Sequence, residues 1–472
     1  MANISEPPRQ SAAKASRFGG WLWRSGEFAR QLMRRFTFAR ALASRSFRLL
    51  WLGQTISNLG NNVFSLALAW QVLLMTHSAT AMGLILMARL VPNLAFVLIG
   101  GVAADRLPRR SIVLWSDGLR GLVLLSVTVL GVAGLLQLWL LVVESLIFGI
   151  VEGFFNPALM SLPPELVAKE ELPSANALTA LSLNLAGLVG PVLGALLIAL
   201  AGPFSAFALD AVSFFISMLL LFPVPIVERH RRSEQEQLGS SALALREDAE
   251  GEEENLVRGR LWGLRSGLQK MLQDLGEGLV YVRRSRWIWV TLLSATVGNV
   301  CFIATLAVSM PKLVQVVYGQ GAGFLGLLET AEAIGSLLSI LLLGVVLRLG
   351  RRGLLAYLFL MLSAAGVLAF GLIPAALALW LAPLASILVG FGLTFFNTVY
   401  FTILQEQVPG DKLGRVISLD TIGSLGLAPL GQVLGGILTD RVGAATVFLL
   451  FGALALGNCL YPLLVREVRE TL

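Results

Sequence analysis

The sequence has few of the residues that enzymes and secreted scaffolds use for catalysis, metal binding or cross-linking. Its 472 residues include two cysteines and two histidines, and only 14% of them are charged. Cys301 and Cys459 lie in separate apolar runs, without the CxxC or Cys/His spacing of a metal or redox site. His77 and His230 lie in polar breaks between apolar runs, which favours solvated loop positions. We therefore expect no metal ion, no cofactor and no histidine-based catalysis.

The chain is instead rich in apolar residues. Hydrophobic residues make up 56% of it, and its mean hydropathy is +0.78. Ordinary globular domains carry about 25% charged residues, so the composition excludes a soluble domain, a disulfide-bonded secreted scaffold and a disordered chain. Twelve helices of roughly 22 residues, each long enough to cross a bilayer, would account for the apolar share.

Twelve apolar runs of suitable length predict an all-α membrane protein. The first six runs are Phe47–Leu74, Thr80–Ala103, Ser111–Gly131, Leu138–Met160, Ser174–Ala201 and Phe204–Val224. The other six are Trp287–Met310, Ala322–Leu347, Gly353–Ile373, Ala376–Thr402, Val416–Leu438 and Ala444–Val465. The chain then consists of a basic N-terminal arm (1–46), a six-helix bundle (47–224), a polar central loop (225–286), a second six-helix bundle (287–465) and a tail (466–472).

The distribution of basic residues predicts the orientation in the membrane. With both termini in the cytoplasm, 32 of the 36 lysines and arginines fall on the cytoplasmic side, as the positive-inside rule requires. Because this charge lies beside membrane helices, we interpret it as contact with anionic lipids of the cell membrane and expect no nucleic-acid partner. The arm lacks the apolar core of a signal peptide, and we interpret the acidic run Glu247–Glu254 as a solvated linker.

The two halves of the chain repeat each other at an offset of 241 residues. The positions that match include Phe154-Phe155-Asn156 with Phe395-Phe396-Asn397, Glu165 with Glu406, Gly190 with Gly431 and Gly194 with Gly435. With a two-residue adjustment, Arg89 meets Glu332. Two bundles of six helices in the same orientation predict a pseudo-two-fold axis along the membrane normal, a substrate site near the midplane and alternating access by rocking.

The loop after the second apolar run carries a recognisable motif. Residues 101–110 read G-V-A-A-D-R-L-P-R-R, which resembles the G-x-x-x-D-R-x-G-R-R signature of the major facilitator superfamily, with Pro108 at the second Gly position. The resemblance implies that Asp105, Arg106 and Arg109 latch one half against the other, with Gly101 and Arg110 completing the motif. The alternative is a plain basic loop. In the second half Arg348 stands where the Asp would be.

Further motifs resemble one branch of that superfamily, the macrolide-efflux and enterobactin-exporter-like permeases. Gly190-Pro191-Val192-Leu193-Gly194 is similar to the core of a motif associated with exporters, although a structural kink is the alternative. Asp117-x-x-Arg120 and Asp210-Ala211-x-Ser213-Phe214 are similar to local patterns of the branch. The arginine used for proton coupling in many family antiporters is missing, because Ser145 occupies its position beside Glu144.

Ionisable residues inside membrane helices are costly and are therefore candidates for function. Glu144, Glu152, Glu329 and Glu332 are our candidates for proton coupling, because burial favours the neutral form of a carboxyl group and lets it bind and release a proton. The alternative for each is a carboxylate stabilised by hydrogen bonds. Asp117 and Arg120, three residues apart, are expected to form a structural ion pair within one helix.

Polar and small residues complete the candidate site. The expected cavity residues are Asn58, Asn62, Arg89, Asn299 and Asn397, with helix–helix hydrogen bonding as the alternative for the amides. The expected helix-packing residues are Gly190, Pro191, Gly194, Gly431 and Gly435.

Together these features favour a monomeric secondary transporter that exports amphiphilic or drug-like molecules, macrolide- or siderophore-like, in exchange for protons. An uptake permease of the same fold and a lipid flippase are the alternatives. The HExxH, nucleophile-elbow and P-loop patterns are absent from the sequence, so we expect neither an enzyme nor direct use of ATP.

Overall fold

The computed structural model describes residues 37–225, 279–280, 282–283, 285–346 and 352–471. The described chain is all-α and contains no strand. Twelve of its helices are long and apolar enough to cross a membrane, which confirms the predicted number. Most of the N-terminal arm and of the central loop, including Glu247–Glu254 and His230, lies outside the described residues, as does Arg348.

Six of these helices form the first bundle. They are α2 (Arg45–Thr76), α3 (Ala79–Arg106), α4 (Arg109–Val132), α5 (Leu138–Met160), α7 (Leu172–Ala201) and α8 (Pro203–Leu221). Three short elements lie beside them, η1 (Thr37–Ala43), α6 (Pro163–Leu166) and η2 (Lys169–Glu171). We call the end of the molecule at which α2 begins the terminal side. The opposite end, at which α2 ends, is called the far side.

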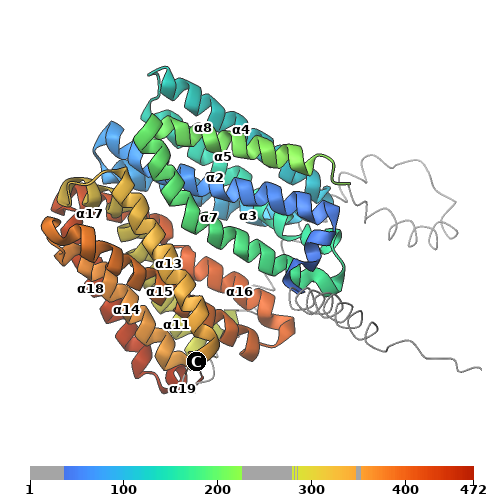
Figure 1. The fold of residues 1–472 in the computed structure, drawn as a ribbon. Helices are drawn as coiled ribbons and strands as arrows, with labels where there is room; N and C mark the ends of the chain where they lie inside the picture. Colours follow the sequence, from blue (N-terminus) through green and yellow to red (C-terminus); the bar gives the residue numbers. More distant parts are fainter. Residues whose placement is uncertain (1–36, 226–278, 281, 284, 347–351, 472) are drawn as a thin grey trace, which may run out of the picture.

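The second bundle has the same order of six spans. They are α11 (Arg286–Phe302) with its continuation to Val317, α13 (Ala322–Val346), α14 (Arg352–Leu372), α15 (Ala375–Gln407), the pair α16 (Gly410–Leu425) and α17 (Ala428–Val442), and α18 (Ala444–Leu464). A short helix, α19 (Arg466–Thr471), follows on the terminal side. Figure 1 shows the bundles side by side, the first in blue to green and the second in yellow to red.

Local chemistry explains where several helices begin. The hydroxyl of Ser44 accepts a hydrogen bond from the backbone amide of Phe47 at 3.3 Å, and so caps α2. Ser78 caps α3 in the same way through the amide of Ala81. These contacts satisfy amide groups that a helix start leaves without partners. His77 lies between the two helices, in the left-handed backbone region with a φ of 51°.

The seventh span runs to Val317, whereas the sequence predicts its end at Met310. Proline normally ends a helix because it lacks an amide proton, but here Pro311 follows the π-helical segment η3 (Ile303–Ser309), and the span continues through α12 (Met310–Lys312) and η4 (Leu313–Val317). In this π-helical segment, side-chain hydroxyl groups donate hydrogen bonds to backbone carbonyl oxygens. Thr305 donates to Cys301 at 2.8 Å and Ser309 donates to Ala304 at 2.7 Å.

Two other boundaries differ from the prediction. The tenth span extends to Gln407, five residues past Thr402, because its last turns remain helical beside the terminal-side loops. The eleventh span begins at Gly410 and is broken at 426–427, ahead of Pro429. The sequence predicted one continuous helix, Val416–Leu438, because hydropathy does not register a break of two residues.

The predicted repeat is confirmed by equivalent close approaches of helices. A Cβ on Gly194 would lie 3.2 Å from the carbonyl oxygen of Val63, and one on Gly435 would lie 2.7 Å from the Cα of its repeat equivalent, Ala304. A Cβ on Gly149 would lie 2.1 Å from the carbonyl oxygen of Arg89, and one on Gly390 would lie 1.9 Å from that of Glu332. The alignment of the two halves that the sequence predicts therefore also relates equivalent positions in the structure.

The repeat extends to an ion pair on the terminal side. Arg109 Nη1 lies 3.0 Å from Glu165 Oε1 in the first bundle. Arg352 Nη1 lies 2.9 Å from Glu406 Oε2 at the equivalent place in the second. Arg109 and Arg352 lie at the starts of α4 and α14, while Glu165 lies in α6 just after α5 and Glu406 in the last turn of α15. Arg109 thus acts within its own bundle in this conformation.

The bundles touch along two helix pairs, α3 with α17 and α7 with α13. A Cβ on Gly83 would lie 2.2 Å from the carbonyl oxygen of Gln432, and one on Gly326 would lie 2.6 Å from that of Pro191. Both contacts lie in the far halves of their helices. Small residues allow this approach in lipid, where packing drives helix association.

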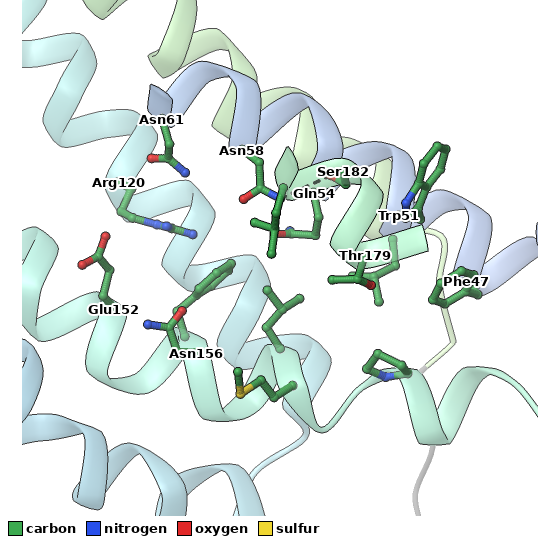
Figure 2. Close-up of a pocket in the computed structure, with 16 residues that line it drawn as sticks. Phe47, Trp51, Gln54, Asn58, Asn61, Arg120, Glu152, Asn156, Thr179 and Ser182 are labelled. Carbon is green, nitrogen blue, oxygen red and sulfur yellow. Dashed lines mark hydrogen bonds between the residues drawn. The ribbon is translucent and has the colours of Figure 1, made fainter. Parts of the chain in front are cut away.

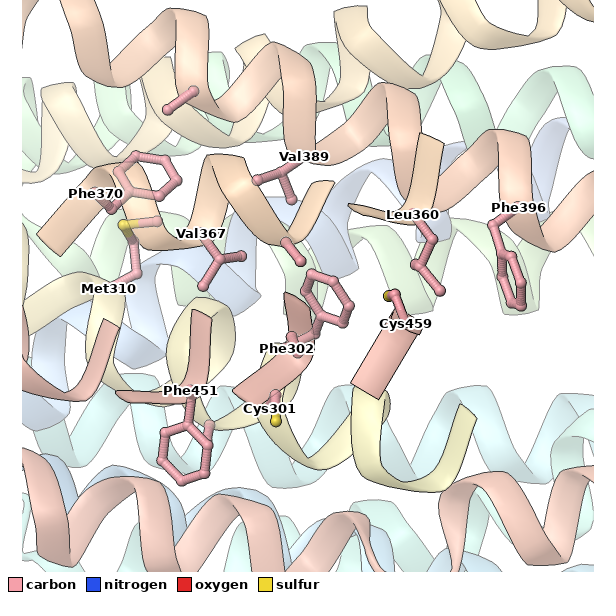
Figure 3. Close-up of a cluster of buried hydrophobic side chains, with 14 of the residues drawn as sticks. Cys301, Phe302, Met310, Leu360, Val367, Phe370, Val389, Phe396, Phe451 and Cys459 are labelled. Carbon is pink, nitrogen blue, oxygen red and sulfur yellow. The ribbon is translucent and has the colours of Figure 1, made fainter. Parts of the chain in front are cut away.

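The second bundle is held together by one large apolar cluster. Phe302, Val367, Leu360 and Cys459 lie in this cluster and are drawn together in Figure 3. Leu66 of the first bundle also belongs to it, so the two bundles share buried apolar surface. Both cysteines are free and buried within it or at its edge.

The glycine contacts generate a test on one helix. A Cβ on Gly190 would lie 2.4 Å from the Cβ of Asn62, whereas nothing lies within 4 Å of a Cβ on Gly187. Overpacking costs about 1–3 kcal/mol, so Gly190→Leu is expected to lower the melting temperature in detergent by several degrees. Gly187→Leu is the matched control and is expected to leave it unchanged or higher. Equal melting temperatures for the two variants would contradict this packing.

Candidate functional site

A cavity of about 280 Å³ lies inside the first bundle (Figure 2). It is bounded by α2, α5, α7 and one residue of α4, in the half of the bundle nearer the terminal side. Its polar lining residues are Gln54, Asn58, Asn61, Arg120, Glu152, Asn156, Thr179 and Ser182. Trp51, Phe47 and Phe155 contribute aromatic surface. The cavity therefore offers amide, hydroxyl and charged groups together.

A second cavity, of about 90 Å³, lies at the equivalent place in the second bundle. Its lining includes Asn299, Asn397 and Phe396, which are the repeat equivalents of Asn58, Asn156 and Phe155. Its remaining aromatic lining residues are Phe302, Tyr400 and Phe401. The two cavities are therefore the same feature of the fold, present once in each half.

The two cavities differ in chemistry although they share a position. Asn61 in the first corresponds to Phe302 in the second, and Gln54 corresponds to Ala295. The first cavity has an arginine and four amide side chains, and the second has Phe302, Tyr400 and Phe401 beside the polar residues Ser294, Asp420 and Ser424. Each cavity therefore offers both hydrogen-bonding groups and aromatic surface.

Arg120 reaches the first cavity from a buried ion pair. Its Nη2 lies 2.5 Å from Asp117 Oδ1, which confirms the pair predicted from the spacing. Ser217 donates to the second carboxylate oxygen of Asp117 at 2.7 Å. The guanidinium lies 3.9 Å from the ring centre of Phe155 and 4.5 Å from that of Phe214. Paired charge and cation–π contact together compensate for the loss of hydration.

Arg89 forms the other buried ion pair, with Glu152. Asn93 donates to Glu152 at 3.2 Å, and the Arg89 guanidinium lies 5.3 Å from the ring centre of Phe148. Arg89 had been expected in the substrate cavity. It is Glu152 that lines the cavity, with Arg89 behind it.

The other proton-coupling candidates are the three remaining glutamates, and Arg89 lies near enough to one of them, Glu144, to act on its charge. Glu144 is buried and accepts one hydrogen bond, from Ser145 at 3.0 Å. Glu329 and Glu332 lie half-buried on α13, beyond Gly326 toward the terminal side. In the described part of the chain, no lysine or arginine forms an ion pair with any of the three.

The amide candidates divide between cavity and packing. Asn58, Asn299 and Asn397 line the cavities, as the sequence suggested. Asn62 instead donates to the backbone of Asn58 at 2.8 Å and packs against Gly190. Asn61, which the sequence also suggested beside Asn58 and Asn62, lines the first cavity. Asn156 was not predicted as a cavity residue, although its repeat match with Asn397 was a signal for it.

The residues of the predicted latch lie on the terminal side. Asp105 is 78% exposed, and its ionic contact within the described residues is with Arg109 at 3.9 Å. Arg110 donates to the backbone carbonyls of Leu221 and Phe222. Nothing lies within 4 Å of a Cβ on Gly101, and Arg106 is exposed. In this conformation the motif's described contacts therefore stay within the first bundle.

A different contact joins the bundles on the far side, and we call it the far-side clasp. Asp440 at the end of α17 accepts hydrogen bonds at the start of α3: from the amides of Ala79 and Thr80 at 2.8 and 2.9 Å, and from the hydroxyls of Ser78 and Thr80 at 2.5 and 2.6 Å. Lys312 adds an ion pair at 2.6 Å. A carboxylate at a helix start meets both unpaired amides and the positive end of the helix dipole.

These features coincide with a known transporter family. The family model of the Major Facilitator Superfamily matches residues 50–428 and, in an overlapping match, 325–471. The chain belongs to the major facilitator superfamily. It is accordingly an integral inner-membrane protein and a transporter.

Relatives and solved structures agree with this assignment. The chain is 27% identical over 450 residues to the enterobactin exporter EntS of Shigella boydii serotype 18 and of Escherichia coli O139:H28, covering 90% of this chain and 94% of each relative. A POT family transporter in complex with a thioalcohol conjugated peptide has a TM-score of 0.64 at 12% identity, covering 89% of this chain and 96% of that one. A bacterial homologue of the iron transporter ferroportin, in an inward-facing state, has a TM-score of 0.62 at 18% identity, with 88% and 98% covered. At these identities the two structures show the fold alone.

The buried Asp117–Arg120 pair can be tested by breaking it and then removing it. Removing one partner of a buried pair costs about 3–5 kcal/mol, because a charge is left buried without a partner, whereas replacing both by apolar groups is often neutral. Asp117→Asn is therefore expected to lower the melting temperature in detergent strongly, and the double variant Asp117→Asn/Arg120→Met to recover much of the loss. If the double variant melts lower than Asp117→Asn, the pair is not the source of the effect. Asp105→Asn, at an exposed position, is the control.

Proposed function

We propose that this transporter exports amphiphilic small molecules, siderophore-like molecules among them, in exchange for protons and without a chemical step. The observation that carries the proposal is the pair of repeat-related cavities with unlike linings. A substrate with hydrogen-bonding groups and aromatic or apolar surface would find partners of both kinds in each cavity. The chain acts as a monomer in this proposal, since the two cavities are both on one chain.

The direction of transport follows from the orientation that we propose. With both termini in the cytoplasm, the terminal side is cytoplasmic and the cavities lie in the cytoplasmic half of the protein. The relatives are named as exporters. Among the exporter-associated residues, Gly190 and Gly194 pack α7 against α2, and Pro191 lies where α7 meets α13. These features support export rather than uptake.

Alternating access requires the bundles to close on one side and separate on the other. The far-side clasp supports a conformation that is closed on the far side, while the exposed Asp105 supports a latch that is disengaged on the terminal side. In the opposite conformation Asp440 would leave the start of α3 and the latch residues would engage. The polar central loop joins the two bundles and would let them move.

Proton coupling in this proposal uses carboxyl groups that lack a basic partner. Glu144, Glu329 and Glu332 fit this condition better than Glu152, which pairs with Arg89. A carboxyl group in a membrane interior is neutral unless a cation compensates it. These three groups would therefore gain and lose protons as their access to water alternates.

Transport can be measured in inside-out membrane vesicles with enterobactin as the probe. An exporter driven by proton exchange is expected to accumulate the probe when the vesicle lumen is made acidic, and to stop when an ionophore removes the gradient. An uptake permease would expel the probe under the same gradient. A flippase would instead move labelled phospholipid, with no response to the gradient. Either of these results would contradict the proposal.

The cavity linings predict that two substitutions weaken substrate binding in different ways. Asn156→Leu removes a hydrogen-bonding group worth about 1 kcal/mol, so it is expected to raise the KM for enterobactin about fivefold. Phe396→Leu removes aromatic surface on the other side and is expected to raise the KM for aromatic probes more than for aliphatic ones. Leu200→Ala, at a position 77% exposed toward lipid, is the control. KM values equal to the control for both variants would place the substrate elsewhere.

The far-side clasp predicts a change in access when it is removed. Asp440→Ala deletes the acceptor of four hydrogen bonds between the bundles and removes the ion pair with Lys312 within the second bundle. The population open to the far side is therefore expected to rise. A cysteine introduced at Thr179 in the first cavity would then react several-fold faster with a membrane-impermeant maleimide added to intact cells. Glu406→Gln, which breaks an ion pair within one bundle, is the control, and equal rates would contradict the role of the clasp.

A further inference from the structure

The membrane interior of the first bundle holds more acidic than basic groups. Its acidic residues are Asp117, Glu144, Glu152 and Asp210, and its basic residues are Arg89 and Arg120. Both arginines already form ion pairs, Arg120 with Asp117 and Arg89 with Glu152. Two carboxyl groups, those of Glu144 and Asp210, therefore remain without an ion-pair partner among the described residues.

Asp210 is the more isolated of the two. It has no exposed surface, and its Oδ1 accepts one hydrogen bond, from Ser213 on the same helix at 2.9 Å. Its Oδ2 is buried and has no hydrogen-bond partner. An ionised carboxylate in lipid or protein interior needs several donors or a cation, and one hydroxyl supplies neither.

The packing around Asp210 keeps its carboxyl group in place. Gly60 of α2 lies against it, so close that a Cβ there would be 2.4 Å from Asp210 Oδ1. The charged groups that face Asp210 are Arg120 of α4, Arg89 of α3 and Glu144 of α5. Between their ends, α2 and α7 bring no charged residue to it. Among the described residues, the cations that act on Asp210 are therefore the two that already have partners.

A second oxygen without a partner lies close by in the chain. Asn61 Oδ1 is buried and unpartnered, and Asn61 follows the glycine that touches Asp210. The residue also lines the first cavity, where Figure 2 shows it near Arg120 and Glu152. A proton on Asp210 would turn an unpartnered acceptor into a donor, and the Asn61–Gly60 segment connects that group to the substrate cavity.

We propose that Asp210 is a proton-binding residue of this transporter and that, with Glu144, it gives the first bundle two exchangeable protons. This inference rests on the proposed exchange of substrate for protons. One proton binds Asp210 Oδ2 in the conformation described, and leaves as H⁺ when the bundles rearrange and an arginine or water reaches the carboxylate. No other bond forms or breaks. Glu144 lies near enough to interact with Asp210, so ionisation of one group disfavours ionisation of the other.

Asp117 provides a matched control for Asp210. Both are aspartates without exposed surface in the same bundle, but Asp117 is bonded to Arg120 and Asp210 is not. If Asp210 is protonated, Asp210→Asn replaces one neutral group by another of the same shape and leaves the melting temperature in detergent unchanged, while Asp117→Asn lowers it. A comparable fall in both variants would show that Asp210 is an ionised structural residue and would overturn the proposal.

The deciding experiment reads protonation directly and needs no substrate. Infrared spectra of the purified full-length protein in detergent, recorded from acidic to alkaline pH, show the carbonyl band of protonated carboxyl groups. Asp210→Asn is expected to remove part of this band and Asp117→Asn to leave it intact. Ser213→Ala, which removes the hydrogen bond to Oδ1, is expected to shift the frequency of the same component, and it tests the proposal should Asp210→Asn fail to fold. An unchanged band in these variants would overturn the inference.

Transport separates this inference from the proposed function. In inside-out vesicles with an acidic lumen, Asp210→Asn is expected to lose accumulation of enterobactin, the probe used for the wild type. If the wild type itself does not accumulate the probe, the proposed export fails while the infrared result stands. If the wild type accumulates it and Asp210→Asn does so equally well, the proton on Asp210 is not exchanged and the inference fails alone.

Discussion

A charge in the membrane interior must be paired or neutral, and the arrangement of the first bundle follows from this constraint. Arg120 is compensated by Asp117 and by two aromatic rings, and Arg89 by Glu152. The Arg89–Glu152 pair joins α3 to α5, while the Asp117–Arg120 pair lies within α4 and contacts α5 through Phe155 and α8 through Ser217. The carboxyl groups left over, Glu144 and Asp210, become the groups that can carry protons. The same four acidic and two basic residues therefore stabilise the bundle and supply the groups proposed for proton coupling.

The repeat supplies a symmetric scaffold on which the two halves have diverged. Equivalent glycines set the helix crossings, as Gly194 with Val63 and Gly435 with Ala304 show. The same register places Asn58 and Asn299 in equivalent cavities. Around them the side chains differ, because Gln54 and Asn61 of the first cavity correspond to Ala295 and Phe302 of the second. Backbone geometry is therefore shared between the halves, and recognition of an amphiphilic molecule comes from their differences.

Much of the fold was predictable because its signals are local or periodic. Apolar length predicts the spans, the 241-residue repeat predicts two bundles, and the three-residue spacing of Asp117 and Arg120 predicts their pair. The Arg89–Glu152 pair was not predictable in this way, because its partners lie 63 residues apart on different helices. The predicted eleventh span ended at Leu438, before Asp440, and only the structure shows that Asp440 reaches the start of α3. The break before α17 was not predicted, because an interruption of two residues leaves the mean hydropathy of the span unchanged.

Proton movement driven by substrate tests the central claim most directly. The transporter is reconstituted in liposomes that enclose a pH-sensitive dye, and enterobactin is added outside with no pH gradient imposed. Exchange predicts that the lumen becomes alkaline as enterobactin enters, and that protein-free liposomes show no change. Entry of enterobactin with a constant lumenal pH, or with acidification, would contradict an exchange of substrate for protons.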